Sequence, residues 1–306
     1  MTTMKKMFLA ALMLFNASAA VADSDAATAD EVALKPFILG SKGPGAVAEK
    51  VEAAKASLAA KGFTFVGTYT PYPNATILII TSDELKTNAA ASEHGGFGAV
   101  QRVSVTKVKD EVQVSYTNPV YMANVYRMKD DLKSVAAKLE SALGKVEEFG
   151  AKGMTAKKAR KYHYMIGMEY FNEPSVPAEY GSHEEAINAV EAGLAAGKAG
   201  VTKVYRVDVP GKKETVFGVA MAGATEENKY MDDKYIMSEI DFRDIKSTAH
   251  LPYEVLVSDN KVYALYARFR IAISFPDLSM MGKNSFMNIM KAPEAIRTAL
   301  QKTVIK

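Results

Sequence analysis

The sequence predicts an α+β fold made of two related modules in tandem, and three observations support this prediction. Residues 103–122 (VSVTKVKDEVQVSYTNPVYM) and 255–274 (VLVSDNKVYALYARFRIAIS) share one pattern, in which two alternating strands flank a polar turn. The order of strands and helices around these two hairpins is also the same in both halves. Finally, Val112 aligns with Val262 and Tyr116 aligns with Tyr266 at the same offset of 150 residues.

Each module is expected to hold an antiparallel-rich sheet with helices packed on one face. A single module of this kind would leave a sheet edge or face uncovered, and a second copy can cover it. The two modules are therefore expected to form a pseudo-dimer within one chain.

Residues 33–145 are predicted to form the first module. A first strand is expected to end at Gly40, and a helix is expected over 46–62, where apolar residues recur at helical spacing. The later elements are expected to be strands over 63–70 and 75–81, a short helix over 83–93 capped by Ser82 or Asp83, a hairpin turning at Lys109-Asp110, and a closing helix with Leu132, Val135, Ala136 and Leu139 on one face. The glycine-rich segment 94–98 (HGGFG) is interpreted as a mobile lip.

Residues 146–160 are polar and rich in Gly and Lys, which predicts a linker, and residues 161–306 are predicted to form the second module. Its first strand is expected over 162–171, followed by a loop with two prolines. The later elements are expected to be a helix over 182–198 opened by a Ser182/Glu185 capping box, strands over 201–209 and 214–222, a helix over 227–240, hairpin strands over 249–257 and 261–273, and helical pieces over 284–290 and 293–302.

The segment that runs from the buried strand through the hairpin to TNPVYM (117–122) resembles the domain-of-unknown-function 302 family. In that family an Asn/Asp-Pro follows the second hairpin strand, and a Pro often precedes the first. Here Asn118-Pro119 stands in the first copy and Leu251-Pro252 in the second, so each copy has half of the signature. The resemblance implies a small α+β module that pairs with another module, and it implies no activity.

The first 22 residues have the parts of a secretory signal peptide. Lys5 and Lys6 precede a short apolar run from Met7 to Phe15, and Ala20-Val21-Ala22 forms a small-x-small cleavage site before Asp23. The mature protein is therefore expected to be soluble and to reside in the periplasm or outside the cell.

Composition narrows the classes of partner. The chain is 48% hydrophobic and 24% charged, which is typical of a globular protein, and it has no cysteine for a disulfide or a thiolate metal site. Without Lys5 and Lys6, 36 basic side chains face 35 acidic ones, so the charge is about +1. This balance does not favour nucleic acid, and no membrane span is expected.

No residue spacing indicates a catalytic or metal motif. The four histidines (His94, His163, His183 and His250) follow neither H-x-x-x-H nor H-E-x-x-H. The acidic residues between Asp232 and Asp244 do not follow the spacing of a calcium loop and are interpreted as a solvated helix face. We therefore expect a protein without catalytic activity and without a cofactor.

Methionine is the compositional feature that suggests a binding site. Twelve methionines lie beyond the leader, and nine of these follow residue 161. Thioethers line pliable apolar surfaces, and tyrosines can place a hydroxyl at the mouth of an apolar pocket. The leading hypothesis is a periplasmic binding or accessory protein that holds a small apolar or amphipathic ligand in or next to the second module. The candidate lining is Met221, Met237, Tyr253, Tyr266, Phe269 and Met287.

Two alternative hypotheses remain. The first is copper handling through Met and His, since thioethers suit copper(I) and Met287 and Met290 have a metal-like spacing. The second is a scaffold that binds another protein in the periplasm, with the methionines as ordinary core.

Overall fold

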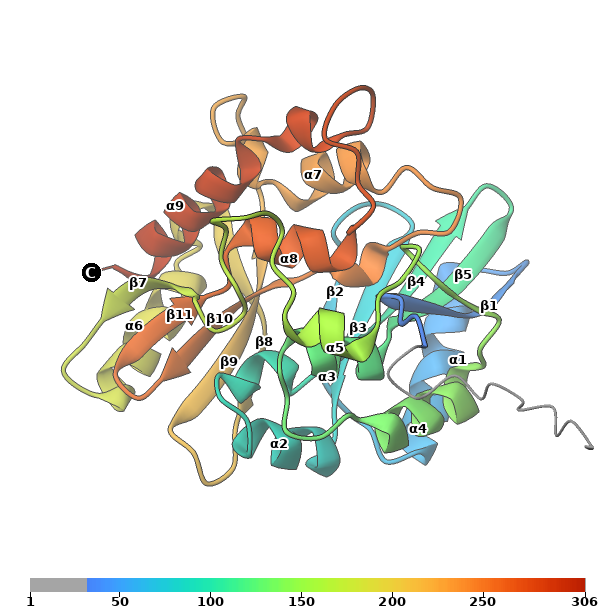
Figure 1. The fold of residues 1–306 in the computed structure, drawn as a ribbon, viewed down its shortest axis with the longest axis horizontal. Helices are drawn as coiled ribbons and strands as arrows, with labels where there is room; N and C mark the ends of the chain where they lie inside the picture. The colour runs from blue at the N-terminus through green and yellow to red at the C-terminus, as the bar shows by residue number, and fades with distance from the viewer. Residues whose placement is uncertain (1–31, 306) are drawn as a thin grey trace, which may run out of the picture.

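The computed structural model of the protein describes residues 32–305, and Figure 1 shows its arrangement. The predicted signal peptide over 1–22 and the expected new N-terminus at Asp23 lie outside the described residues. Within the described range, the chain has the predicted α+β class, with two antiparallel sheets and nine α-helices. Among these described helices, none is both long and apolar enough to cross a membrane.

The first sheet has six strands in the order β2-β3-β4-β5-β1-β6. Their bounds are β1 Phe37–Gly43, β2 Thr64–Tyr69, β3 Ala75–Thr81, β4 Gln101–Val108, β5 Glu111–Thr117 and β6 Glu147–Phe149. Helices α1 (Val47–Ala60) and α4 (Lys133–Leu143) pack together on one face of this sheet. Tyr116 of β5 points to that face, because its hydroxyl donates to the Gly144 carbonyl at the end of α4 over 2.9 Å.

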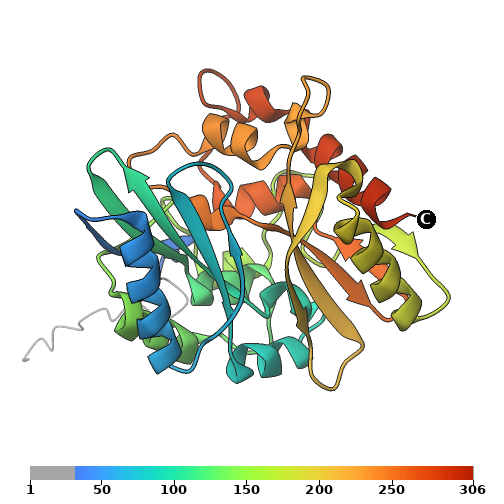
Figure 2. The same ribbon diagram turned by 180° about the vertical axis from the view of Figure 1, so that it is seen from behind.

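The second sheet has five strands in the order β7-β11-β10-β9-β8. Their bounds are β7 Ser175–Glu179, β8 Val201–Asp208, β9 Glu214–Met221, β10 Tyr253–Ser258 and β11 Lys261–Ala264. Helices α6 (His183–Ala195) and α9 (Ala292–Val304) contact each other and this sheet. Figure 2 shows the two sheets side by side, with α1 in front of one and α6 in front of the other.

The connection order is the same in both sheets. If β7 is matched to β1 and β8 to β2, the order β8-β9-β10-β11-β7 repeats β2-β3-β4-β5-β1, and β6 is an addition to the first sheet. The other helices are α2 (Asp83–Ala90), α3 (Pro119–Val125), α5 (Ala156–Arg160), α7 (Asp233–Ile240) and α8 (Ala267–Ser274). The short 3-10 helices are η1 (Gly95–Gly98), η2 (Lys198–Gly200), η3 (Lys229–Met231), η4 (Thr248–His250) and η5 (Phe286–Ile289).

Two predicted helix starts agree with the structure, and a serine caps each of them. Ser82 accepts a hydrogen bond from the backbone of Leu85 at the start of α2. Ser182 does the same for Glu185 at the start of α6. Asn118 caps α3 with Pro119 at its first position, because the proline ring has no N–H that would need a partner there.

One predicted strand of the second half is wrong, and another is shorter than predicted. Residues 162–171 form turns with one isolated bridge between His163 and Tyr170, and the strand β7 follows in the proline-containing segment that was expected to be a loop. A proline is tolerated there because β7 is an edge strand. Residues 267–274 form α8, although they were expected to continue the hairpin. This helix is buried on nearly all sides, so it lacks the apolar stripe that marks a surface helix.

Two predicted loops are also structured. The expected linker 146–160 includes β6, which pairs with β1, and helix α5. The glycine-rich segment expected to be a mobile lip is η1, and all four of its residues are buried.

The two sheets meet at their edge strands β2 and β8, which lie in contact. Each strand has a bulge, between Phe65 and Gly67 in β2 and between Lys203 and Tyr205 in β8. A methyl group on Gly67 would lie 2.6 Å from the Val204 carbonyl oxygen and 2.9 Å from the Tyr205 Cβ. The absence of a side chain at Gly67 therefore allows the two backbones to approach closely.

We expect Gly67→Ala to lower the free energy of unfolding by about 1–3 kcal/mol, because the added methyl must push β2 away from the β8 backbone. Gly43→Ala in β1 is the matched control, since nothing lies within 4 Å of its added Cβ. The control is expected to change stability by less than about 1 kcal/mol. Urea unfolding of both variants measures the difference, and equal losses would contradict a tight contact at Gly67.

Candidate functional site

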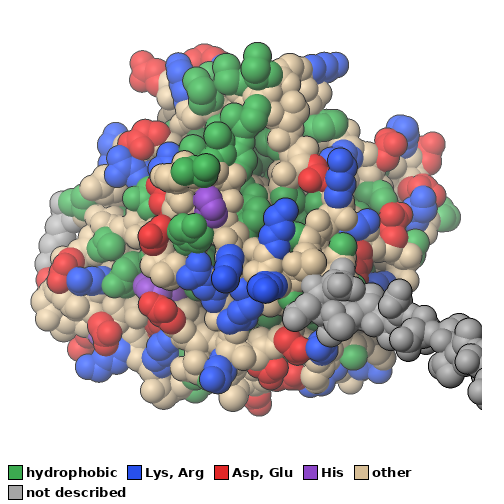
Figure 3. All heavy atoms as spheres, in the orientation of Figure 1, with side chains coloured by type: hydrophobic (Ala, Val, Ile, Leu, Met, Phe, Trp, Pro, Cys, Tyr) green, Lys and Arg blue, Asp and Glu red, His purple; other side chains and the backbone are tan. Residues whose placement is uncertain are grey.

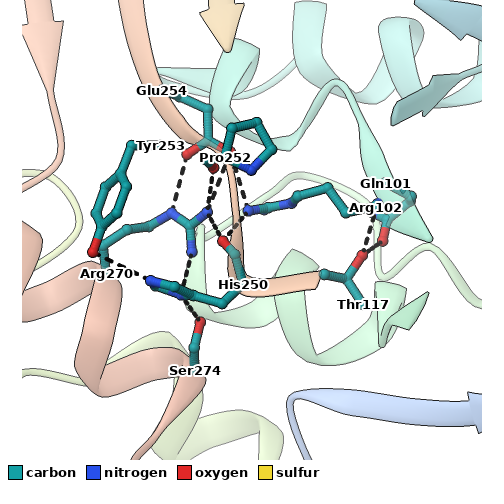
Figure 4. Close-up of polar contacts among 9 residues, drawn as sticks. All are labelled: Gln101, Arg102, Thr117, His250, Pro252, Tyr253, Glu254, Arg270 and Ser274. Atoms are coloured by element: carbon teal, nitrogen blue, oxygen red, sulfur yellow. Dashed lines mark hydrogen bonds and ion pairs between the residues drawn. The ribbon is translucent and has the colours of Figure 1, made fainter. Parts of the chain in front are cut away.

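A buried ion cluster joins the two halves of the chain. Arg102 comes from β4, Glu254 from β10 and Arg270 from α8, and all three are almost fully buried. One Glu254 oxygen lies 3.2 Å from Arg102 Nη1, and the other accepts from Arg270 Nε over 3.0 Å. Figure 4 shows the guanidinium groups of Arg102 and Arg270 next to each other, with both turned toward Glu254.

The same two arginines bind the backbone of η4. Arg102 Nη1 donates to the His250 carbonyl over 3.1 Å, and Arg270 Nη2 donates to it over 2.7 Å. The His250 ring contacts the Ser274 hydroxyl and the Tyr253 hydroxyl through its two nitrogens. Burial and the two guanidinium charges hold the pKa of His250 well below its ordinary value, so the ring is neutral near pH 7. Both ring nitrogens of His250 therefore have hydrogen-bond partners within the fold, and its role is structural.

A seam of hydrogen bonds continues from this cluster to the surface. Thr248 Oγ1 lies 3.0 Å from the Tyr72 hydroxyl and 3.0 Å from Thr106 Oγ1. Gln113 of β5 donates to the Asp244 carbonyl over 2.8 Å and accepts from the Lys246 backbone over 3.0 Å. Residues 244–248 of the second half thus lie along β4 and β5 of the first.

The packing is reciprocal, because η1 of the first half contacts β9 and β10 of the second. The Gly96 N–H donates to Glu214 Oε2 over 3.0 Å, and a methyl group on Gly96 would lie 2.4 Å from Leu256 Cδ1. The segment that precedes each hairpin therefore packs on the other sheet.

Two carboxyl groups are buried at the ends of α7. Asp233 accepts from the Tyr69 hydroxyl over 2.7 Å and from the Met221 backbone over 3.0 Å, and burial raises its pKa to about 7. Asp241 accepts from the Ser247 backbone over 2.9 Å, and burial raises its pKa to about 7 as well. The interpretation of this acidic segment as a solvated helix face is wrong for these two residues.

A groove of about 380 Å³ opens beside the seam. One wall comes from the first half and the other from α7 and the segment after it. Its lining is Tyr72, Pro73, Thr106, Lys107, Lys234, Met237, Ser238, Asp241, Phe242 and Lys246. Lys107 and Lys234 form no ion pair with any residue in the described range, and Phe242 is 51% exposed. The groove therefore offers both unpaired positive charge and apolar surface.

The six residues predicted to line a ligand site lie in different surroundings. Met237 lines the groove, and Met221 is buried at the end of β9, where its backbone binds Asp233. Tyr253 belongs to the ion cluster through its contact with His250. The others lie elsewhere: Phe269 packs on Phe171 and Tyr162, Tyr266 lies under the Arg268 guanidinium, and Met287 is at the surface.

Sequence reasoning missed the residues that form the junction. A charge inside an otherwise apolar strand is the signal that could have found Glu254, because a buried charge needs a partner. Arg102 carries no such signal, since its strand (QRVSVTKV) is polar at several other positions as well. No comparable signal marks Tyr72 or Thr106, since polar residues near strand ends are common.

No three His, Asp or Glu side chains come together as a metal site within residues 32–305. Met287 and Met290 are exposed at the surface. Copper handling by these methionines therefore stays a prediction.

Comparison with known proteins adds no relative: no family model, no curated protein and no solved structure matches the chain.

We expect Glu254→Gln to lower the free energy of unfolding by about 3–5 kcal/mol, because two buried guanidinium groups would lose their counter-charge. Glu294→Gln is the control, since Glu294 forms an exposed ion pair with Arg297 and should matter by less than about 1 kcal/mol. Urea unfolding compares the two. If Glu254→Gln lowers the free energy of unfolding no more than Glu294→Gln does, the ion cluster does not stabilise the fold.

We expect Asp241→Asn to gain stability relative to the original protein as the pH rises from 5 to 8. The pKa of the Asp241 carboxyl is about 7 in the fold and near its ordinary value of 3.8 in the unfolded chain. The folded protein therefore holds a proton that the unfolded chain releases, and this stabilisation is complete below pH 4 and is lost as the pH rises through 7.

The relative gain of the variant should be on the order of 1 kcal/mol or more, measured by urea unfolding at the two pH values. Asp244→Asn is the control, because Asp244 is exposed. If the difference between Asp241→Asn and the original protein does not change with pH, the carboxyl is not protonated in the fold.

Proposed function

We propose that this protein is a non-catalytic binding protein whose ligand is a small amphipathic anion, held in the groove between the first half and α7. The supporting observation is the lining of that groove, which combines apolar side chains with two unpaired lysines. This proposal narrows the sequence-based hypothesis of an apolar or amphipathic ligand, and it keeps Met237 from the predicted lining.

The apolar part of such a ligand would contact Tyr72, Met237 and Phe242. Phe242 exposes half of its surface, so a bound hydrocarbon or ring would remove apolar area from water. Met237 adds an adaptable thioether from α7, and the Tyr72 ring is held in place by the hydrogen bond of its hydroxyl to Thr248.

The anionic part would contact Lys107 and Lys234. These lysines come from opposite walls of the groove, one from β4 and one from α7. Lys246 is less available, because its ammonium group already donates to the Asp241 carbonyl over 2.8 Å. A carboxylate, sulfonate or phosphate between the two free ammonium groups would give each a charged partner.

The broader sequence-based expectations belong to the same proposal. We propose that the two halves are related modules that form a pseudo-dimer of the kind the family resemblance implies. Three features support it: the repeated strand order, the bulges of β2 and β8, and the reciprocal packing of η1 and η4. Export to the periplasm rests on the sequence of residues 1–22.

We expect the full chain to bind 1-anilinonaphthalene-8-sulfonate saturably, with an affinity that falls as salt rises. The double variant Lys107→Gln/Lys234→Gln should weaken binding about tenfold, which corresponds to about 1.4 kcal/mol. Fluorescence titration measures both effects. The uncharged probe N-phenyl-1-naphthylamine tests the anionic contact, because its binding should not depend on the two lysines.

The matched control is Lys42→Gln/Lys61→Gln, two exposed lysines that line no part of this groove. Equal weakening by both double variants, or no saturable binding, would overturn the proposal.

A further inference from the structure

Exposed apolar side chains are concentrated on one face of the second half. They lie in two segments, residues 165–166 and residues 280–290. Ile166 is 98% exposed and Met281 is 75% exposed, and four other methionines of these segments are between 43% and 56% exposed. We call this set the methionine patch: Met165, Ile166, Met280, Met281, Met287 and Met290. Six of the eleven large exposed hydrophobic residues in the described range belong to it, so the patch is not a random scatter.

The two segments of the patch form one surface. The Tyr164 hydroxyl contacts the Met280 sulfur, and the Tyr164 and Phe286 rings lie 5.8 Å apart between centroids. The Met287 backbone donates to the Met280 carbonyl over 3.2 Å. Figure 3 shows apolar side chains gathered on this face, with a group of Lys and Arg side chains below them.

The most exposed part of the patch is a protruding turn. The Met168 backbone donates to the Met165 carbonyl over 3.0 Å, and His163 Nδ1 lies 2.7 Å from the same oxygen. Gly167 has a positive φ of 81°, and nothing lies within 4 Å of a methyl group added to it. Ile166 is therefore held at the tip of an ordered turn that projects into open space. A projecting apolar tip suits a deformable medium such as lipid.

The flank of the patch is positively charged. Helix α5 and the residue after it carry Lys157, Lys158, Arg160 and Lys161, all exposed, just before the turn at His163. None of these four forms an ion pair with a described residue. The nearby carboxylate of Glu169 is already paired with Arg268.

We propose that this face binds the surface of a bilayer that contains anionic lipids, with Ile166 and the methionines inserted among the headgroups. Apolar insertion and attraction between lysines and anionic headgroups are the two contributions that hold proteins on membrane surfaces. The described helices include no membrane span, so this would be association with one leaflet. The proposal is independent of the ligand groove, which uses other residues.

The chain has no tryptophan, so a single introduced tryptophan reports on its own position. We expect the emission of Ile166→Trp to shift to the blue when vesicles of phosphatidylcholine and phosphatidylglycerol are added, and to be quenched by brominated lipid. Vesicles of phosphatidylcholine alone should give a much smaller shift. The matched control is Val146→Trp, at an exposed apolar residue between α4 and β6, which should not respond.

Two further variants in the Ile166→Trp background separate apolar insertion from the attraction between lysines and anionic headgroups. Met281→Asp should raise the lipid concentration for half-maximal shift about tenfold, because it places a charge within the patch. Lys157→Gln/Lys158→Gln/Lys161→Gln should raise it several-fold and remove most of the salt dependence. Circular dichroism checks that each variant is folded.

A folded Ile166→Trp protein whose emission does not change with anionic vesicles would overturn the proposal and leave an acidic protein as the better occupant. An equal response of Val146→Trp would also overturn it, because binding would then not involve the patch.

Discussion

The structure depends on one buried carboxylate shared by two arginines. Glu254 neutralises one guanidinium charge of the Arg102 and Arg270 pair, and hydrogen bonds from both arginines to the His250 carbonyl stabilise the remaining positive charge. Burying this cluster is costly unless every partner stays in place. The groove depends on it in turn, because η4 positions Thr248 against Tyr72 and Thr106, and these two line the groove.

Much of the fold could be predicted from local patterns. Helices α1 and α6 pack a single apolar stripe against a sheet, so their sequences show it, and Ser82 and Ser182 mark the helix starts through hydrogen bonds within one turn. The hairpins were visible because alternation persists along both strands. These features are determined by residues close to each other in the sequence.

The rest is determined by contacts between distant segments. Residues 267–274 alternate like a strand, yet they form α8. This helix is buried on nearly all sides, so no polar solvent face marks a helical period in its sequence. The burial of Asp233 is tolerated because the hydroxyl of Tyr69, a residue 164 positions away in the sequence, donates a hydrogen bond to its carboxyl group. The groove likewise needs two walls from different halves, so no sequence window contains it, and of the predicted lining only Met237 could be placed there.

The two hairpins have matching registers, yet the junction between the two halves is asymmetric. Val112 pairs with Lys107 in the first hairpin and Val262 pairs with Val257 in the second, so Ser104 and Glu254 occupy equivalent register positions. In a homodimer with two-fold symmetry, identical chains would place the same residue at both positions, so a glutamate at one position would require a glutamate at the other. A single chain that contains both hairpins can instead have Glu254 at one position and Ser104 at the other. Each side of the interface can then change by mutation without altering the other side.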